Sequence, residues 1–245
     1  MFSLWRAWKR RQWAKQPFPA EWRPVVERHF PFVAQLQEEE RTRFFTHLQV
    51  FAHEKHFEGA GGLVVTDEMK VVVAGCAARL ARNLPLGIYD DLVTVLLYPS
   101  AWKDPRTEGN VNLGEAHRWG LVVLSWDSVT SGLANSTDGH DTALHEFAHV
   151  IDFVDGQADG TPEFESSTEL HAWARVFSAH YEKLRARPER SQVLRAYGAT
   201  NEAEFFAVAT EAFFERPARL KARAPDLYEE LRKYFRVDPL SNAKR

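Results

Sequence analysis

Cysteine is almost absent from the 245-residue chain, in which Cys76 is the only one. A single cysteine cannot close an internal disulfide, and this usage is typical of proteins that fold in a reducing compartment. Long apolar runs are missing too, since no stretch approaches the roughly 20 apolar residues that a membrane-spanning helix needs. We therefore expect a cytoplasmic protein with no transmembrane segment.

Excess charge of either sign is also small, because 31 Lys and Arg stand against 34 Asp and Glu, a formal net charge of −3. This balance argues against direct nucleic-acid binding. Positive charge is concentrated in residues 1–16, which carry tryptophans among Arg6, Lys9, Arg10, Arg11 and Lys15. The segment lacks the apolar core of a signal peptide. We expect a basic N-terminal arm whose tryptophans pack on the domain; contact with a membrane surface, an acidic partner or nucleic acid is the alternative.

Apolar and aromatic side chains, by contrast, are abundant: 44% of the residues are hydrophobic, with 17 Phe and 8 Trp. Such side chains can bury enough apolar area for a real core. No internal repeat and no linker-like stretch divides the chain. We predict a single domain over residues 17–245.

The periodicity of the apolar residues predicts an α+β fold that is mainly helical. Helical spacing dominates after Pro17 and again after Asp141, whereas residues 63–66, 91–98 and 119–125 are β-rich runs. These runs predict a small β-sheet beside the helix at 141–152. Trp119–Ser125 is the expected edge strand, along which an extended peptide could pair through its backbone.

Residues 145–149 read His-Glu-Phe-Ala-His, an HExxH motif. On an α-helix, His145 and His149 lie one turn apart on the same face, so both imidazoles can bind one metal ion. Glu146 stands beside them and can accept a proton from a water molecule on that metal. The five residues therefore indicate most of a hydrolytic zinc site.

The residues around the motif predict that its helix is buried. They form an apolar stripe at helical spacing, and Asp138 or Asp141 is placed to cap the helix start. Burying two histidines and a glutamate is unfavourable unless a metal or hydrogen bonds satisfy them. We therefore favour a metal site over a pair of core histidines with ordinary hydrogen bonds.

A third ligand has several candidates, because catalytic zinc usually takes three protein ligands and one water. Asp152 lies one turn beyond His149 and could bind the metal, but we favour a role in holding the far nitrogen of a histidine. Glu204 and Glu211 share nearly the same face of a predicted Phe/Ala-rich helix at 202–214. A carboxylate among aromatics needs a partner, and a zinc ion would be one. The alternative is that both acids lie on a solvated edge.

Beyond HExxH, a longer pattern resembles a known family. His-Glu-Phe-Ala-His-x-x-Asp, followed by Tyr197-Gly-Ala-Thr-Asn-Glu-Ala-Glu204-Phe-Phe-Ala, resembles the Mlc titration factor A family of zinc peptidases. Over these motifs alone it is also similar to the catalytic domain of anthrax lethal factor. Similarity to the first family continues through most of the chain, in Pro17–Trp22, Phe57–Gly62, Val65–Met69, Leu124–Asp127, Asp159–Pro162 and Asp238–Leu240.

The resemblance implies a zincin-like fold with one Zn²⁺ bound by His145, His149 and Glu204. It implies that Glu146 is the catalytic base and that Tyr197 lies at the site, where its phenol could hydrogen-bond an oxyanion. It also implies aminopeptidase activity on short peptides or aminoacyl amides. A final implication is binding to Mlc, a transcriptional repressor of glucose-uptake genes.

Two questions remain open at this point. Glu211 is either an outer hydrogen-bond partner of the site or a rival ligand, because one sequence does not fix the rotation of a helix. The alternative function is a non-catalytic, zinc-stabilised binding protein that sequesters a regulator. Glu146 argues against it, since a structural zinc needs no general base. Hydrolysis of other amides would use the same zinc–water chemistry.

Overall fold

The computed structural model describes residues 2–103, 111–117 and 120–241. The α-helices are α1 (Phe2–Lys15), α2 (Arg23–His29), α3 (Glu38–Glu54), α4 (Asp67–Ala81), α5 (Trp126–Ala134), α6 (Thr142–Asp152), α7 (Ser167–Ala186), α8 (Glu202–Glu215), α9 (Pro217–Arg223) and α10 (Pro225–Phe235). The strands are β1 (His56–Gly59), β2 (Thr94–Tyr98), β3 (Trp102–Lys103), β4 (Val111–Asn112), β5 (Gly114–His117) and β6 (Leu121–Ser125).

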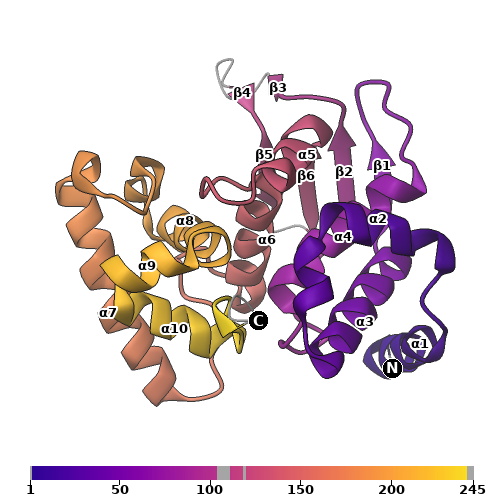
Figure 1. The fold of residues 1–245 in the computed structure, drawn as a ribbon, viewed down its shortest axis with the longest axis horizontal. Helices are drawn as coiled ribbons and strands as arrows, with labels where there is room; N and C mark the ends of the chain where they lie inside the picture. Colours follow the sequence, from indigo (N-terminus) through magenta and orange to yellow (C-terminus); the bar gives the residue numbers. More distant parts are fainter. Residues whose placement is uncertain (1, 104–110, 118–119, 242–245) are drawn as a thin grey trace.

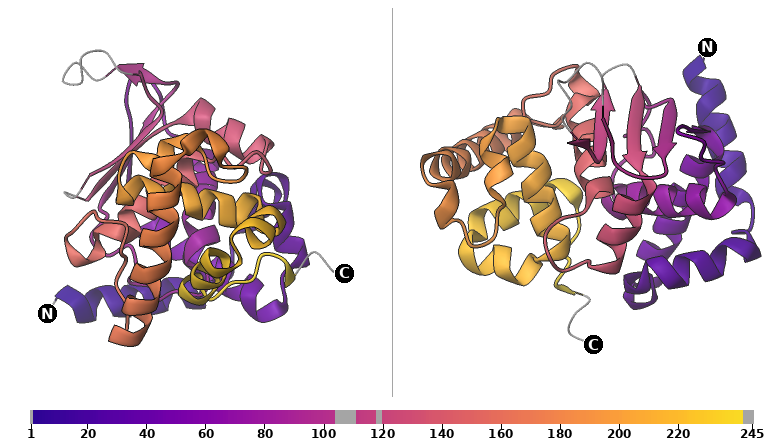
Figure 2. Two further views of the ribbon diagram at one scale, coloured as in Figure 1. Left: turned by 90° about the vertical axis from the view of Figure 1, so that its left-hand side faces the viewer. Right: turned by 90° about the horizontal axis from the view of Figure 1, so that it is seen from above.

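Helices α1–α4 and α7–α10 form two groups, with α6 and the main sheet between them (Figure 1). The same division is visible from above in Figure 2, where the strands stand between the two groups. Helices dominate and the main sheet is small, so the predicted α+β class is confirmed. Among the described residues, no helix is both long and apolar enough to span a membrane.

The main sheet has the strand order β1-β2-β6-β5. β1, β2 and β6 run parallel, whereas β5 pairs with β6 in the antiparallel direction. β2 and β6 are rich in Val and Leu and bury alternate or consecutive side chains, as expected for strands covered by helices. The sheet ends at β5, and this edge strand lies against α6.

Two sequence-based strand predictions were wrong. Leu121–Ser125 is not an edge strand, because β6 pairs with β2 on one side and with β5 on the other; Trp119 itself lies outside the described residues. The run at 63–66 forms no strand, and β1 begins earlier, at His56. β5 reads Gly-Glu-Ala-His, whose polar residues gave no strand signal, so the edge strand that pairs with β6 was missed.

The N-terminal segment is a helix that packs on α3. Trp13 stacks on His53 with the ring centroids 5.7 Å apart. Trp5 and Trp8 are each 56% exposed. The expectation that the tryptophans pack on the domain is therefore right for Trp13 and wrong for Trp5 and Trp8.

Aromatic packing holds α6 in place between the two groups of helices. Phe147 is fully buried, and its ring meets Phe51 of α3 and Tyr89 at centroid distances of 5.6 Å in both cases. The side chain points away from the motif histidines on either side of it, as the helical period requires. The apolar face of α6 therefore fixes where its polar face points.

We predict that Phe147→Ala lowers the free energy of unfolding by about 3–5 kcal/mol, because it removes a fully buried ring and leaves a cavity. The measurement is urea denaturation of protein treated with a chelator, so that loss of metal does not contribute. Leu170→Ala is the matched control, since Leu170 is 38% exposed, and it should change stability by less than about 1 kcal/mol. Equal effects of the two substitutions would contradict the packing argument.

Candidate metal centre

Helix α6 brings the two motif histidines to the same side. Asp141 caps the helix by accepting a hydrogen bond from the backbone N–H of Leu144 at 3.0 Å, which settles the choice between Asp138 and Asp141. Every residue from Thr142 to Asp152 is buried. His145 and His149 lie one turn apart and direct their Nε2 atoms to one point, 3.2 Å from each other.

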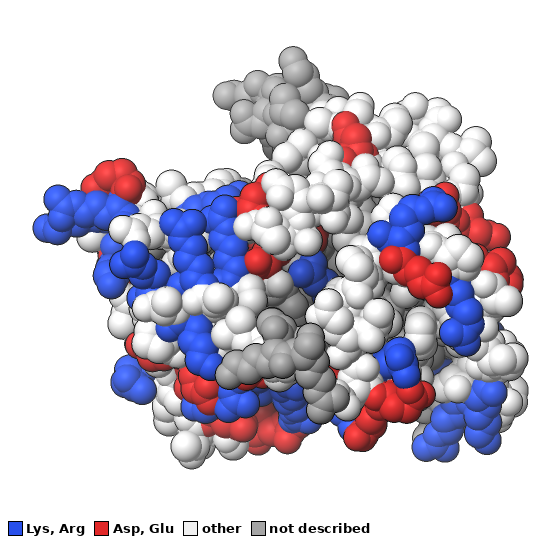
Figure 3. All heavy atoms as spheres, in the orientation of Figure 1, with Lys and Arg blue, Asp and Glu red and all other residues white. Residues whose placement is uncertain are grey.

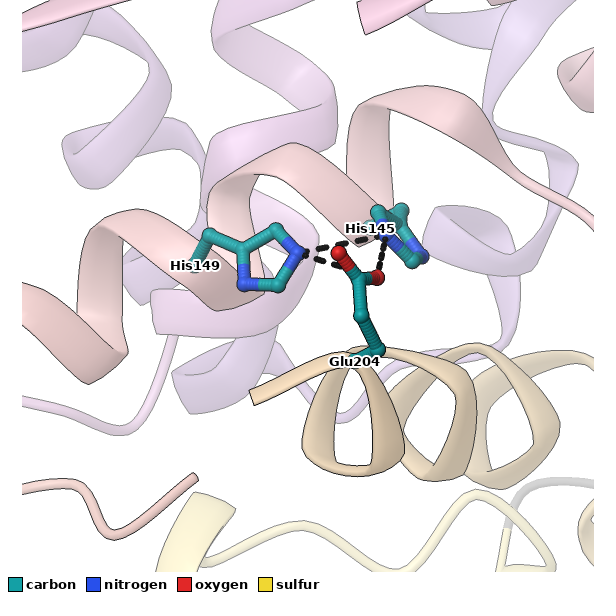
Figure 4. Close-up of side chains that lie close together, drawn as sticks. All are labelled: His145, His149 and Glu204. Atoms are coloured by element: carbon teal, nitrogen blue, oxygen red, sulfur yellow. Dashed lines mark hydrogen bonds and ion pairs between the residues drawn. The ribbon is translucent and has the colours of Figure 1, made fainter. Parts of the chain in front are cut away.

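Helix α8 supplies a carboxylate to the same point. Asn201 caps α8 by accepting a hydrogen bond from the backbone N–H of Glu204 at 2.9 Å, which places Glu204 in the first turn. Figure 4 shows its carboxylate between the two imidazoles. Glu204 Oε2 lies 2.9 Å from Nε2 of His145 and 3.4 Å from Nε2 of His149. A carboxylate from a distant part of the sequence thus meets the two motif histidines.

The separations of these three atoms fit a metal ion. Tetrahedral zinc with ligands at 2.0–2.2 Å has ligand atoms about 3.3–3.6 Å apart. The observed 2.9, 3.2 and 3.4 Å lie close to that range. Two imidazole nitrogens and one carboxylate oxygen are also the donor types of catalytic zinc sites. His145, His149 and Glu204 are therefore a candidate ligand set.

The electrostatics of the cluster favour a cation. Burial by itself would raise the pKa of Glu204, but hydrogen bonds from His145 and His149 outweigh it and hold that pKa well below its usual value. Burial lowers the pKa of His145, yet hydrogen bonds to Glu204 and Glu211 raise it to about 10. The carboxylates thus stabilise positive charge at the point where the three side chains meet.

Glu211 lies on the opposite side of His145 from Glu204. It is fully buried, and its Oε2 lies 3.3 Å from Nδ1 of His145, where it also accepts a hydrogen bond from Arg195. Its Oε1 accepts a hydrogen bond from the backbone N–H of Asp141 at 2.9 Å. Glu211 thus contacts the nitrogen that faces away from the candidate ligand atoms, as carboxylates that orient metal-binding histidines do.

Asp152 also lies outside the three-atom cluster, and it makes no hydrogen bond to a histidine among the described residues, contrary to the role expected from its spacing. Its Oδ2 accepts a hydrogen bond from the backbone N–H of Gly160 at 3.0 Å, and its Oδ1 has no hydrogen-bond partner among the described residues. Burial raises its pKa to about 7. The structure therefore groups Glu204, and neither Glu211 nor Asp152, with the two histidines.

Glu146 is buried beside the cluster and lines a cleft of about 270 Å³. Its carboxyl group makes no hydrogen bond to any described residue, and burial raises its pKa. The edge strand touches it: a Cβ on Gly114 would lie 2.5 Å from Glu146 Oε1. Only glycine at this position lets β5 approach so closely.

Tyr197 lines the same cleft from the short helix Ala196–Ala199. Its ring centroid is 5.9 Å from that of His145, and the side chain is 51% exposed. Burial of the hydroxyl and the charge of Glu204 raise the pKa of Tyr197 to about 12. The phenol therefore keeps its proton at neutral pH and can donate a hydrogen bond into the cleft.

Sequence reasoning missed four residues that line this cleft: Leu113, Gly114, Thr142 and Arg195. The only signal for Arg195 was its position two residues before Tyr197. Gly114 follows a polar loop, and nothing in its spacing connects it with Glu146. His140, which stands just before the motif helix, also lines the cleft.

Comparison with known proteins identifies the family. Residues 5–236 match the glucose-regulated metallo-peptidase M90 family. The chain belongs to this family. It is 35% identical to an uncharacterized protein of Synechocystis over 254 aligned positions, which cover 98% of this chain and 92% of the relative.

Other M90 relatives carry a functional name. The chain is 28% identical to proteins named Mlc titration factor A from Yersinia pestis and Yersinia pseudotuberculosis, over 99% of this chain and 92% of each relative. The resemblance inferred from the motifs is confirmed. A metallopeptidase family implies a metal ion, and the cluster on α6 and α8 is where the described residues could hold one.

We predict that Glu211→Gln weakens zinc binding about 10–100-fold, because the loss of its charge removes the partner that orients His145. Zinc affinity is measured by competition with a chromogenic chelator. Glu215→Gln is the matched control. Glu215 lies on the same helix and accepts a hydrogen bond from the backbone N–H of His140, but no contact with His145 or His149 is seen among the described residues. Unchanged affinity in Glu211→Gln would assign Glu211 a purely structural role.

Proposed function

We propose that this M90 metallopeptidase is a zinc-dependent aminopeptidase that uses His145, His149 and Glu204 as metal ligands. Glu146 is the general base and Tyr197 the hydrogen-bond donor to the substrate carbonyl. The observation that carries the proposal is the convergence of the three candidate ligand atoms beside the buried carboxyl group of Glu146, which has no hydrogen-bond partner among the described residues. The family supports peptidase chemistry at this point of the fold.

A zinc ion bound there would supply a Lewis acid and an acidified water. Glu146 lines the cleft and accepts the proton of the attacking water. It then returns that proton to the leaving amine, which is the ordinary cycle of a general base and acid. Tyr197 donates its phenolic proton in a hydrogen bond to the carbonyl oxygen as negative charge develops there. Glu146 is buried on α6, and the low dielectric of this environment strengthens its electrostatic interactions.

The peptide would bind along β5 (Gly114–His117). This strand ends the sheet, so its outer edge has no partner strand among the described residues. An extended peptide can add to such an edge through backbone hydrogen bonds. Because Gly114 touches Glu146, a peptide paired here would place a carbonyl next to the base. The small cleft suits the reaction of short peptides or aminoacyl amides.

The proposal includes a protein partner and a compartment. Relatives named Mlc titration factor A support binding of an Mlc-like transcriptional repressor by this chain. The single cysteine, Cys76, is fully buried and unpaired, which suits a cytoplasmic protein. A zinc-stabilised binder without activity is the alternative, but such a protein has no use for a desolvated general base.

The deciding experiment measures hydrolysis of aminoacyl p-nitroanilides by purified protein with its zinc content quantified. Glu146→Gln should retain zinc and lose at least about 100-fold in kcat, as expected for a missing general base. Glu204→Gln should lose zinc and activity together. Glu202→Gln is the control, because Glu202 is exposed on α8 and is not among the residues that line the cleft. This substitution should leave zinc content and activity unchanged.

If wild type and Glu146→Gln bind zinc and are equally inactive on a broad substrate panel, the non-catalytic binding protein becomes the better conclusion. Tight zinc retention by Glu204→Gln would shift the third ligand to Glu211 or Asp152. Hydrolysis of non-peptide amides alone would replace the peptidase by another amide hydrolase.

We further predict that Gly114→Ala lowers kcat about tenfold or more while zinc stays bound, because the new methyl group displaces the Glu146 carboxyl from the cleft. Gly87→Ala is the matched control, since its Cβ would meet only Asp90 at an ordinary 3.5 Å. The readouts are kcat, KM and zinc content. Full activity of Gly114→Ala would show that the position of Glu146 does not limit the reaction.

A further inference from the structure

Helix α1 exposes an unusual amount of apolar surface. Leu4 is 78% exposed, and Trp5 and Trp8 are each 56% exposed. Within the described part of the chain, no other helix exposes more than one large apolar side chain. Exposed clusters of this kind mark contact sites, whereas single exposed residues need no explanation.

The opposite face of α1 is anchored, so these side chains cannot turn inward. Arg10 is buried and donates hydrogen bonds to both carboxylate oxygens of Glu54 and to Asp90. Arg6 and Trp13 share that inner face by helical spacing, with Arg6 donating to the backbone oxygen of Asp90. The rotation of the helix about its axis is therefore fixed.

The exposed face combines its apolar groups with free positive charge. By helical spacing, Leu4, Trp8, Arg11 and Lys15 form one stripe that points away from the anchored side. Arg11 and Lys15 make no ion pair with any described residue, and α1 contains no acidic residue. Lys9 lies outside this stripe, with its Nζ 4.0 Å from the centroid of the Trp5 ring. Lys and Arg side chains are visible at the lower right of Figure 3, where α1 lies.

We propose that α1 is a membrane-docking helix that lies in the plane of an anionic lipid surface. Tryptophan prefers the headgroup region of a bilayer, leucine the acyl boundary below it, and lysine and arginine the lipid phosphates. The stripe of Leu4, Trp8, Arg11 and Lys15 offers all three chemistries on one side of one helix. A second copy of the chain is disfavoured as the occupant, because it would oppose like charges.

The position of α1 is compatible with an open active site. Figures 1 and 2 place α1 at the side of the molecule away from α7 and α8. The cleft lies where α6 and α8 meet. Docking through α1 therefore leaves the cleft accessible and would bring the peptidase to the inner surface of a membrane.

The test is co-sedimentation of the full-length protein with vesicles of phosphatidylcholine alone or with about one quarter phosphatidylglycerol, at about 0.1 M salt. We expect binding to the anionic vesicles and a loss of at least about tenfold in affinity for Trp5→Ser/Trp8→Ser and for Arg11→Glu/Lys15→Glu. Leu170→Ser, on α7, is the control and should bind like wild type. Aminoacyl p-nitroanilide hydrolysis should be unchanged in all three variants.

Wild type that stays in the supernatant with anionic vesicles would overturn the proposal. So would equal binding by wild type and Trp5→Ser/Trp8→Ser, since the exposed rings would then have no part in it. Dimerisation in sedimentation velocity that the same double substitution abolishes would replace the membrane by a second copy. DNA binding that depends on Arg11 and Lys15 but not on the tryptophans would replace it by nucleic acid.

Discussion

The arrangement of the site depends on one imidazole ring held from both sides by one helix. Glu204 meets Nε2 of His145 and Glu211 meets Nδ1 of the same ring. The two glutamates are seven residues apart on α8, so they stand on nearly the same face about 10 Å apart along the axis. At that spacing, the ring of His145 can lie between the two carboxylates. The contacts of both glutamates with His145 therefore help to fix the rotation and the height of α8 against α6.

This arrangement is stable only because further groups donate hydrogen bonds to the buried carboxylate of Glu211. A fully buried carboxylate is strongly unfavourable without partners, and removal of one member of such a network costs several kcal/mol. The backbone N–H of Asp141 and the guanidinium of Arg195 provide two hydrogen bonds in addition to the contact with His145. Asp141 is also the cap of α6, so the start of the motif helix and the body of α8 are tied to the same carboxylate.

The two site helices could be predicted from the sequence, because their signals lie within short stretches of residues. HExxH spacing places both histidines on one helix face, and Asn201 with the Phe/Ala-rich segment after it marks a capped, buried helix. The choice between Glu204 and Glu211 could not be made in this way, because helical periodicity gives both residues the same face. Only the packing of α8 on α6 decides which glutamate meets the Nε2 atoms of the histidines. The sequence has no local signal for how far along its axis α8 is placed against α6.

The errors have a similar physical origin. Leu121–Ser125 was recognised as a strand from its Val and Leu content, yet whether a strand is central or at the edge depends on a partner elsewhere in the chain. That partner, β5, is Gly-Glu-Ala-His, and its pairing comes from position beside β6 and α6 rather than from intrinsic β-propensity. The tryptophans of α1 were misjudged because their burial depends on how the helix is rotated, which Arg10 decides through distant Glu54 and Asp90.

Glu146 gives the strongest physical argument for catalysis over a purely structural metal. Its carboxyl group is buried, has no hydrogen-bond partner among the described residues and lies against the backbone of β5. A glutamine or an apolar residue at this position would avoid the cost of desolvating a carboxylate. Stability alone therefore gives no reason for a glutamate here. A raised pKa in a cleft, next to candidate metal ligands, is typical of a carboxylate that accepts and donates protons in catalysis. The unfavourable burial of Glu146 is thus explained by the proposed reaction and not by the stability of the fold.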